Sequence, residues 1–119
     1  MLSQYDCGID IENLRDFPQN VLKRVCSEKE LEFINSSDDK NAAAFLLWTL
    51  KESYAKTTGV GMSDMKNVSF SFDGDIIRSN QNGFLFDSCR SRTDFILSVC
   101  QKSASPELSL NFLTLEELF

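Results

Sequence analysis

The chain of 119 residues contains no histidine, so proton transfer near pH 7 has to use a carboxylate, a lysine, a tyrosine, a cysteine or a metal-bound water. It has only 2 prolines and 5 glycines, and no apolar run approaches the roughly 18 residues that a membrane span requires. The 4 cysteines form no Cys-x-x-Cys pair, which argues against a zinc finger, and without histidine a Cys/His nucleophile is excluded. Any chemistry at neutral pH therefore rests mainly on carboxylates and lysines.

Positive charge is scarce as well. The chain has 12 Lys and Arg against 18 Asp and Glu, a net charge of −6, which argues against nucleic acid as the main partner. A phosphate-handling function would therefore need a metal ion or a local basic cluster. The first residues show no basic segment followed by an apolar one, so we expect a cytoplasmic protein with reduced cysteines. With 42% apolar residues, we expect one domain over residues 1–119.

Helices are predicted in the first half of the chain. Ser27 and Glu30 form a capping-box pattern ahead of an apolar run, which is typical of a helix start. The longest helical pattern has Ser37 or Asp38 as its N-cap, and Gly59 marks its end. The expected helices cover residues 18–25, 27–36 and 38–57.

Strands are predicted mainly in the second half. Residues 67–73 alternate strictly between apolar and polar side chains, which is the clearest strand signal in the chain. Residues 94–101 are apolar on both faces, so we expect this strand in the centre of a sheet. The order of elements predicts an α+β domain with the long helix packed on an antiparallel sheet. The expected strands cover residues 5–12, 67–73, 83–90, 94–101 and 108–112, and a final turn begins near residue 114.

Residues 8–12, Gly-Ile-Asp-Ile-Glu, carry the first candidate site. Ile9 and Ile11 point to one face of the predicted strand, and Asp10 and Glu12 point to the other. Side chains on the same face are about 7 Å apart along a strand, so two carboxylates can converge on one hard divalent cation such as Mg²⁺. Taken alone, the pattern also fits a solvated acidic face, and a third carboxylate is needed to decide.

Glu52 is the candidate for that carboxylate, and it lies in residues 48–56, Trp-Thr-Leu-Lys-Glu-Ser-Tyr-Ala-Lys. At helical spacing, Trp48, Glu52 and Lys56 fall at i, i+4 and i+8 and share one face. A solvated surface ion pair explains Glu52 and Lys56 equally well from spacing alone. If this helix packs beside the acidic strand, however, three carboxylates and a lysine form a magnesium and phosphate site.

Together the two segments resemble the paired signature of the 4′-phosphopantetheinyl transferases. Residues 8–12 match the G-[IV]-D-[IV]-E strand of the surfactin-type branch, and residues 48–56 match its W-[ST]-x-K-E-[AS]-x-x-K helix at every defined position. The similarity continues over nearly the whole chain. The chain is similar to the C-terminal half of the surfactin-type enzymes, whereas its length is like that of the holo-acyl-carrier-protein synthases.

The resemblance implies a role for each candidate residue. The ligands of a Mg²⁺ ion bound to the diphosphate of coenzyme A would be Asp10, Glu12 and Glu52. Glu52 or a metal-bound water would deprotonate the acceptor serine, and Lys56 would stabilise or protonate the leaving phosphate. Lys51 would contact the phosphates, and Trp48 would shape the wall of the site.

The implied reaction is transfer of 4′-phosphopantetheine from coenzyme A to a serine of an apo acyl or peptidyl carrier protein, with release of 3′,5′-ADP. The surfactin-type enzymes have a further half that contributes coenzyme A contacts, and only seven residues precede Gly8 here. We therefore expect a homodimer or homotrimer that binds coenzyme A between subunits. The alternative is a non-catalytic half-domain that binds carrier protein or nucleotide, or that pairs with another subunit.

Overall fold

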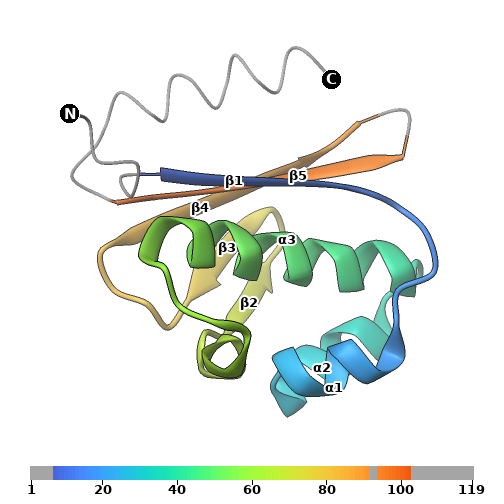
Figure 1. Cartoon of the computed structure of the whole chain (residues 1–119). Coiled ribbons are helices and arrows are strands. Elements are labelled where there is room, and N and C mark those ends of the chain that lie inside the picture. Colours follow the sequence, from blue (N-terminus) through green and yellow to red (C-terminus); the bar gives the residue numbers. More distant parts are fainter. Residues whose placement is uncertain (1–6, 92–93, 103–119) are drawn as a thin grey trace.

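A computed structural model describes residues 7–91 and 94–102 and shows a long helix lying along one face of a three-stranded sheet (Figure 1). The short helices α1 and α2 lie on the far side of that long helix, α3, and a separate hairpin of strands β2 and β3 flanks it. The described elements are β1 Cys7–Asn13, α1 Gln19–Val25, α2 Glu28–Ser36, α3 Lys40–Thr58, the 3₁₀ helix η1 Met62–Asn67, β2 Phe70–Asp73, β3 Ile76–Ser79, β4 Phe84–Arg90 and β5 Phe95–Lys102.

The sheet is antiparallel, with strand order β1-β5-β4. The register sets Gly8 opposite Cys100 and Asp10 opposite Ser98. The central place of β5, which is buried along most of its length, confirms the prediction made for residues 94–101. The α+β class and the packing of the long helix on an antiparallel sheet are confirmed as well.

Several local predictions need correction. The N-cap of α3 is Asp39, whose side chain accepts a hydrogen bond from the backbone N–H of Ala42, and not Ser37 or Asp38. The strand predicted from residue 67 begins at Phe70, because η1 occupies the chain up to Asn67. The hairpin strand β3 was not predicted at all. The elements expected at 108–112 and near 114 lie outside the described residues.

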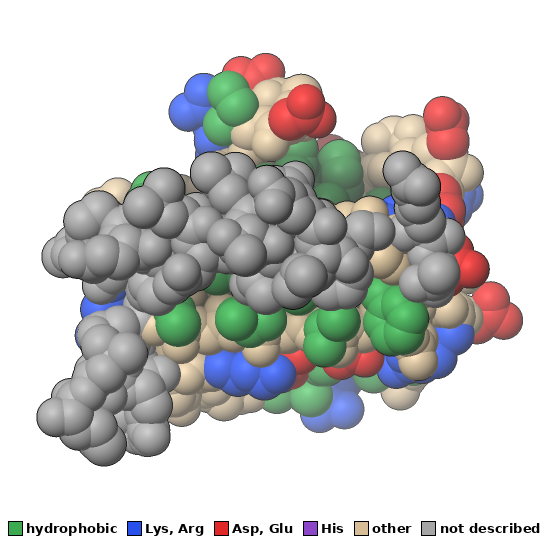
Figure 2. All heavy atoms as spheres, turned by 90° about the horizontal axis from the view of Figure 1, so that it is seen from above, with side chains coloured by type: hydrophobic (Ala, Val, Ile, Leu, Met, Phe, Trp, Pro, Cys, Tyr) green, Lys and Arg blue, Asp and Glu red, His purple; other side chains and the backbone are tan. Residues whose placement is uncertain are grey.

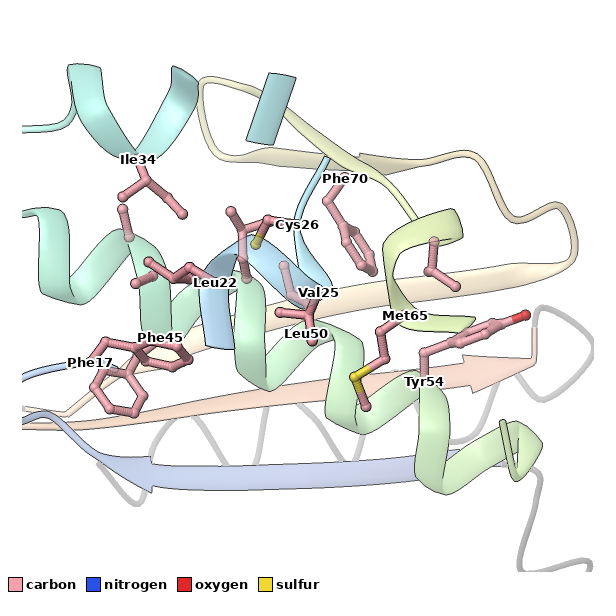
Figure 3. Close-up of a cluster of buried hydrophobic side chains, with 14 of the residues drawn as sticks. Phe17, Leu22, Val25, Cys26, Ile34, Phe45, Leu50, Tyr54, Met65 and Phe70 are labelled. Carbon is pink, nitrogen blue, oxygen red and sulfur yellow. The ribbon is translucent and has the colours of Figure 1, made fainter. Parts of the chain in front are cut away.

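The core is built around α3 (Figure 3). Phe45 and Leu50 of α3 are buried against side chains from the shorter helices and from η1, including Leu22 and Met65. Most of the side chains of α3 are buried or half-buried, so the helix is held on several sides. None of the described helices has the length and apolar composition needed to cross a bilayer.

Strand β1 approaches α3 closely at Gly8. A Cβ atom on this residue would lie 2.3 Å from the carbonyl oxygen of Ser53, 2.6 Å from Thr57 Oγ1 and 3.0 Å from Lys56 Cβ. Two of these distances are far below van der Waals contact, so only glycine permits the observed spacing. The glycine of the first motif is therefore a packing requirement that brings the acidic strand onto the helix of the second motif.

Replacing Gly8 with alanine tests this contact. The added methyl group would push β1 away from α3, and we expect the free energy of unfolding to fall by about 1–3 kcal/mol or more. Chemical denaturation measures the change. Gly61→Ala is the matched control, because no atom lies within 4 Å of the Cβ position there and its φ is −91°. Equal stability of the two variants would contradict the close contact.

Candidate functional site

The acidic face of β1 is the face that packs against α3. Asp10 is buried, whereas Ile9 and Ile11 are exposed on the outer face of the sheet. This orientation reverses the usual preference for apolar side chains inside. It places Asp10 and Glu12 on the same side of the sheet as the helix that carries Glu52 and Lys56.

Lys56 and Asp10 form the central ion pair of the site. Lys56 Nζ lies 2.8 Å from Asp10 Oδ1 and also donates to the carbonyl oxygen of Ile9 at 3.1 Å. The Asp10 side chain is 7% exposed, whereas the Lys56 side chain is 51% exposed. Lys56 can therefore hold Asp10 and still meet an anion that arrives from solvent.

One carboxylate oxygen of Asp10, Oδ2, is buried and makes no hydrogen bond. Burial raises the pKa of Asp10 above its ordinary value of 3.8, although Lys56 opposes the rise and Glu12 adds to it. A buried carboxylate oxygen without a partner is costly, and such atoms are concentrated at functional sites. This oxygen is therefore available to a cation or to a hydrogen-bond donor.

Glu52 belongs to the same electrostatic cluster. Burial raises the pKa of Glu52 above its ordinary value of 4.5, and the charges of Asp10 and Glu12 raise it further while Lys56 lowers it. Glu12 lies at the outer end of the cluster, where Arg15 Nη2 is 3.5 Å from its Oε1. The structure thus brings together the three predicted carboxylates and Lys56, and the net charge of these four groups is negative.

The donor set fits Mg²⁺ in its chemistry. All three acidic groups offer hard oxygen ligands, the type that Mg²⁺ prefers, and one buried oxygen of Asp10 has no partner. Within residues 7–91 and 94–102, however, no three His, Cys, Asp or Glu side chains already stand in a metal-binding arrangement. The carboxylates would therefore have to turn toward one ion, and Asp10 could offer Oδ2 while its Oδ1 stays paired with Lys56.

The other two predicted site residues lie elsewhere on α3. Trp48 is half-buried one helical turn before Glu52, and its ring meets that of Phe17 edge-on with the centroids 5.9 Å apart. Lys51 is fully buried on another side of the helix, where burial lowers its pKa and the charge of Glu30 opposes this. The structure therefore does not bring Lys51 to the carboxylates.

Sequence reasoning missed two residues that shape this region. Glu30 was identified only as a helix cap, although it also pairs with Lys51 inside the protein. Arg15 was not singled out, although it contacts Glu12 and lies over the ring of Phe45. A capping residue followed by an apolar run gives no signal for a distant ion pair, so only the fold reveals it.

A cluster of one buried and two half-buried carboxylates with a flanking lysine, set between a strand and a helix, defines a class of site suited to divalent cations and phosphate groups. The sequence model of the 4′-phosphopantetheinyl transferase superfamily (ACPS) matches residues 6–104. The chain belongs to this superfamily, and the resemblance read from its two motifs is confirmed.

A curated relative of the chain is the 4′-phosphopantetheinyl transferase gsp of Aneurinibacillus migulanus. The two are 33% identical over 63 residues, which cover 51% of this chain and 27% of the relative. The matched part thus spans about a quarter of the length of that relative.

The fold is similar to crystal structures of holo-[acyl-carrier-protein] synthase (AcpS). The structure from Neisseria meningitidis gives a TM-score of 0.65 at 19% identity, covering 83% of this chain and 98% of that chain. The structure from Thermotoga maritima gives 0.60 at 17% identity, covering 81% and 61%. At these identities the likeness establishes the fold.

Glu52→Gln tests the electrostatic strain in the cluster. Because the folded state raises the pKa of Glu52, the folded protein binds that proton more tightly than the unfolded chain does. The charged carboxylate therefore lowers the free energy of unfolding at neutral pH, and this effect disappears as the pH falls below 4.5. In metal-free buffer we expect the variant to be more stable than wild type at neutral pH, by no more than about 1 kcal/mol.

Denaturation curves across the acidic range measure this difference. The gain should shrink as the pH is lowered, because the wild-type carboxyl then carries a proton as well. Glu32→Gln is the control, since Glu32 is an exposed helical glutamate. A gain of equal size for both variants, or one that grows at low pH, would contradict the strained cluster.

Proposed function

We propose that the protein transfers 4′-phosphopantetheine from coenzyme A to a serine of an apo acyl or peptidyl carrier protein and releases 3′,5′-ADP. The observation that carries this proposal is the cluster of Asp10, Glu52 and Lys56, in which a buried carboxylate oxygen has no partner. Membership of the superfamily supports the same reaction. Both matched motifs contribute to the cluster, so the residues that define the family signature are also close in space.

Asp10, Glu12 and Glu52 are the proposed ligands of Mg²⁺. When bound, the ion supplies positive charge that neutralises the diphosphate of coenzyme A. This solves the problem set by a chain with a net charge of −6, which on its own would repel a polyanionic substrate. Coenzyme A is the proposed co-substrate, and its diphosphate would approach from the side on which Lys56 is open to solvent.

The proposed proton acceptor is Glu52. It lies beside the charged groups of the cluster, and no histidine is available for the task. The serine oxygen forms a bond to the β-phosphorus, and the bond from that phosphorus to the bridging oxygen breaks. The serine proton passes to Glu52, and the negative charge on the departing phosphate is met by the ammonium group of Lys56.

Trp48 is proposed to form part of the wall of the site, since it lies one turn before Glu52 on the same helix face. Its contact with Phe17 keeps part of the ring in the core, so the indole has a fixed position. A phosphate contact by Lys51 remains a sequence-based prediction, and the burial of that side chain speaks against it.

A transfer assay tests the proposed function. Incubation with coenzyme A, Mg²⁺ and an apo carrier protein should add the mass of phosphopantetheine to the carrier, as read by mass spectrometry. Glu52→Gln and Lys56→Met should each lower kcat by at least about 100-fold, because each removes a proton acceptor or a charge that stabilises the leaving group.

Glu32→Gln is again the matched control and should transfer like wild type, because Glu32 is exposed on α2. Equal activity of wild type and Glu52→Gln would refute the assigned mechanism. A wild-type protein that modifies no fatty-acid, polyketide or peptide carrier would instead favour the non-catalytic half-domain, which binds carrier protein or nucleotide or pairs with another subunit.

We also propose that copies of this chain associate as a homodimer or homotrimer, with coenzyme A bound between them. Ile9 and Ile11 are exposed on the outer face of β1, which is an edge strand of the described sheet. Figure 2 looks down on this face and shows hydrophobic side chains in a row along it. Exposed apolar side chains favour association, and Ile9 and Ile11 lie on the strand that carries Asp10 and Glu12.

Sedimentation equilibrium tests the association. Wild type should have the mass of a dimer or trimer, and Ile11→Glu should shift the protein toward monomer, because a charge would be buried in the contact. Ile76→Glu is the control, since Ile76 is 55% exposed and Ile11 is 46% exposed, but Ile76 lies in the separate hairpin. A monomeric wild type, with or without coenzyme A and Mg²⁺, would contradict the association.

A further inference from the structure

Lys51 is buried, and every proton of its ammonium group is donated to an acceptor. Its Nζ lies 2.9 Å from Glu30 Oε1 and donates to the carbonyl oxygens of Met65, at 2.8 Å, and Val68. The side chain is 0% exposed. A lysine ammonium has three donors, so this set of contacts leaves no proton for a further acceptor.

Glu30 is equally committed at the other end of this ion pair. Its Oε1 accepts from the backbone N–H of Ser27 at 2.8 Å, and its Oε2 accepts from the backbone N–H of Phe70 at 2.9 Å. The side chain is 1% exposed. The pair therefore ties together the start of α2, the middle of α3, the end of η1 and the start of β2, and we call this set of contacts the Lys51 clamp.

The Lys51 clamp holds one side of α3 against α2 and η1. Successive residues of an α-helix are about 100° apart, so Glu52 stands about 100° and Lys56 about 140° around the axis from Lys51. With Lys51 held against α2 and η1, these two side chains have to face β1, where Lys56 meets Asp10. A rotation that carried Lys51 toward the carboxylates would turn Glu52 and Lys56 away from the strand.

We propose that Lys51 is a positioning residue for Glu52 and Lys56 and that it does not bind phosphate. This inference rests on the proposed transfer function, in which Glu52 and Lys56 act on the substrate. To reach a phosphate, Lys51 would have to leave Glu30 as an unpaired charge in the core and to release two buried carbonyl groups, which is strongly unfavourable.

A charge-neutral replacement of the clamp separates positioning from phosphate binding. Lys51→Met leaves Glu30 charged and unpaired, whereas the double variant Glu30→Gln with Lys51→Met removes both charges and keeps side chains of similar size. Lys40→Met is the control, because Lys40 is an exposed lysine on the same helix. The measurements are thermal unfolding, kcat and KM for coenzyme A, and amide hydrogen exchange along α3.

For a positioning role, folded Lys51→Met has faster exchange along α3 and a kcat lowered by about tenfold or more, with KM for coenzyme A within about threefold of wild type. The double variant removes the unpaired charge, so it melts at a higher temperature than Lys51→Met, with slower exchange and a higher kcat, although the carbonyls of Met65 and Val68 still lack the lysine donor. Lys40→Met behaves as wild type throughout. If Lys51→Met does not fold, the KM of the double variant for coenzyme A still distinguishes positioning from phosphate binding.

Two results overturn the proposal. A KM for coenzyme A raised about tenfold or more in the double variant identifies Lys51 as a phosphate ligand. A folded Lys51→Met protein with wild-type exchange and kcat shows that the clamp does not orient the helix. Hydrogen exchange can be measured without any transfer reaction. If the wild-type protein modifies no carrier, the proposed function is refuted, and the exchange rates along α3 still show whether Lys51 orients the helix.

Discussion

The close packing of β1 on α3 at Gly8 is the constraint on which the site depends. The strand lies so near the helix that a Cβ atom at this position would overlap the carbonyl of Ser53. Because the backbones are so close, the side chain of Asp10 two residues later is buried between strand and helix and meets Lys56 directly. A wider spacing would admit water, weaken the ion pair and remove the desolvation that raises the pKa of Asp10 and Glu52.

Two lysines on the same helix illustrate how environment assigns a role. Lys51 is sealed in the core with acceptors for all three protons, whereas Lys56 is half-exposed beside a cluster with excess negative charge. In the arrangement around Lys51, every proton of the ammonium group has an acceptor, so these contacts stabilise the fold. The arrangement around Lys56 leaves a carboxylate oxygen of Asp10 without a partner and an ammonium open to solvent, which is the unbalanced state expected of a binding site.

Local signals predicted those parts of the fold that depend on neighbouring residues. The capping box of Ser27 and Glu30 and the left-handed Gly59 at the end of α3 are both observed, because they are settled within a few residues of sequence. The helix η1 and the strand β3 were missed. The carbonyl of Met65 in η1 accepts from the distant Lys51, and β3 is formed by pairing with β2, so neither element is specified by its own segment alone.

The sequence by itself determined the chemistry that is available: acidic residues on one face of a strand, Glu52 and Lys56 one turn apart on a helix, no histidine, and a two-motif signature of a known superfamily. Periodicity supplies these relations, because it orders side chains within a single element. Only the tertiary structure decided that the acidic face of β1 turns toward α3, that Lys56 reaches Asp10, and that Lys51 points into the core. Those outcomes depend on how elements far apart in sequence pack together, and side-chain spacing within one element does not contain that information.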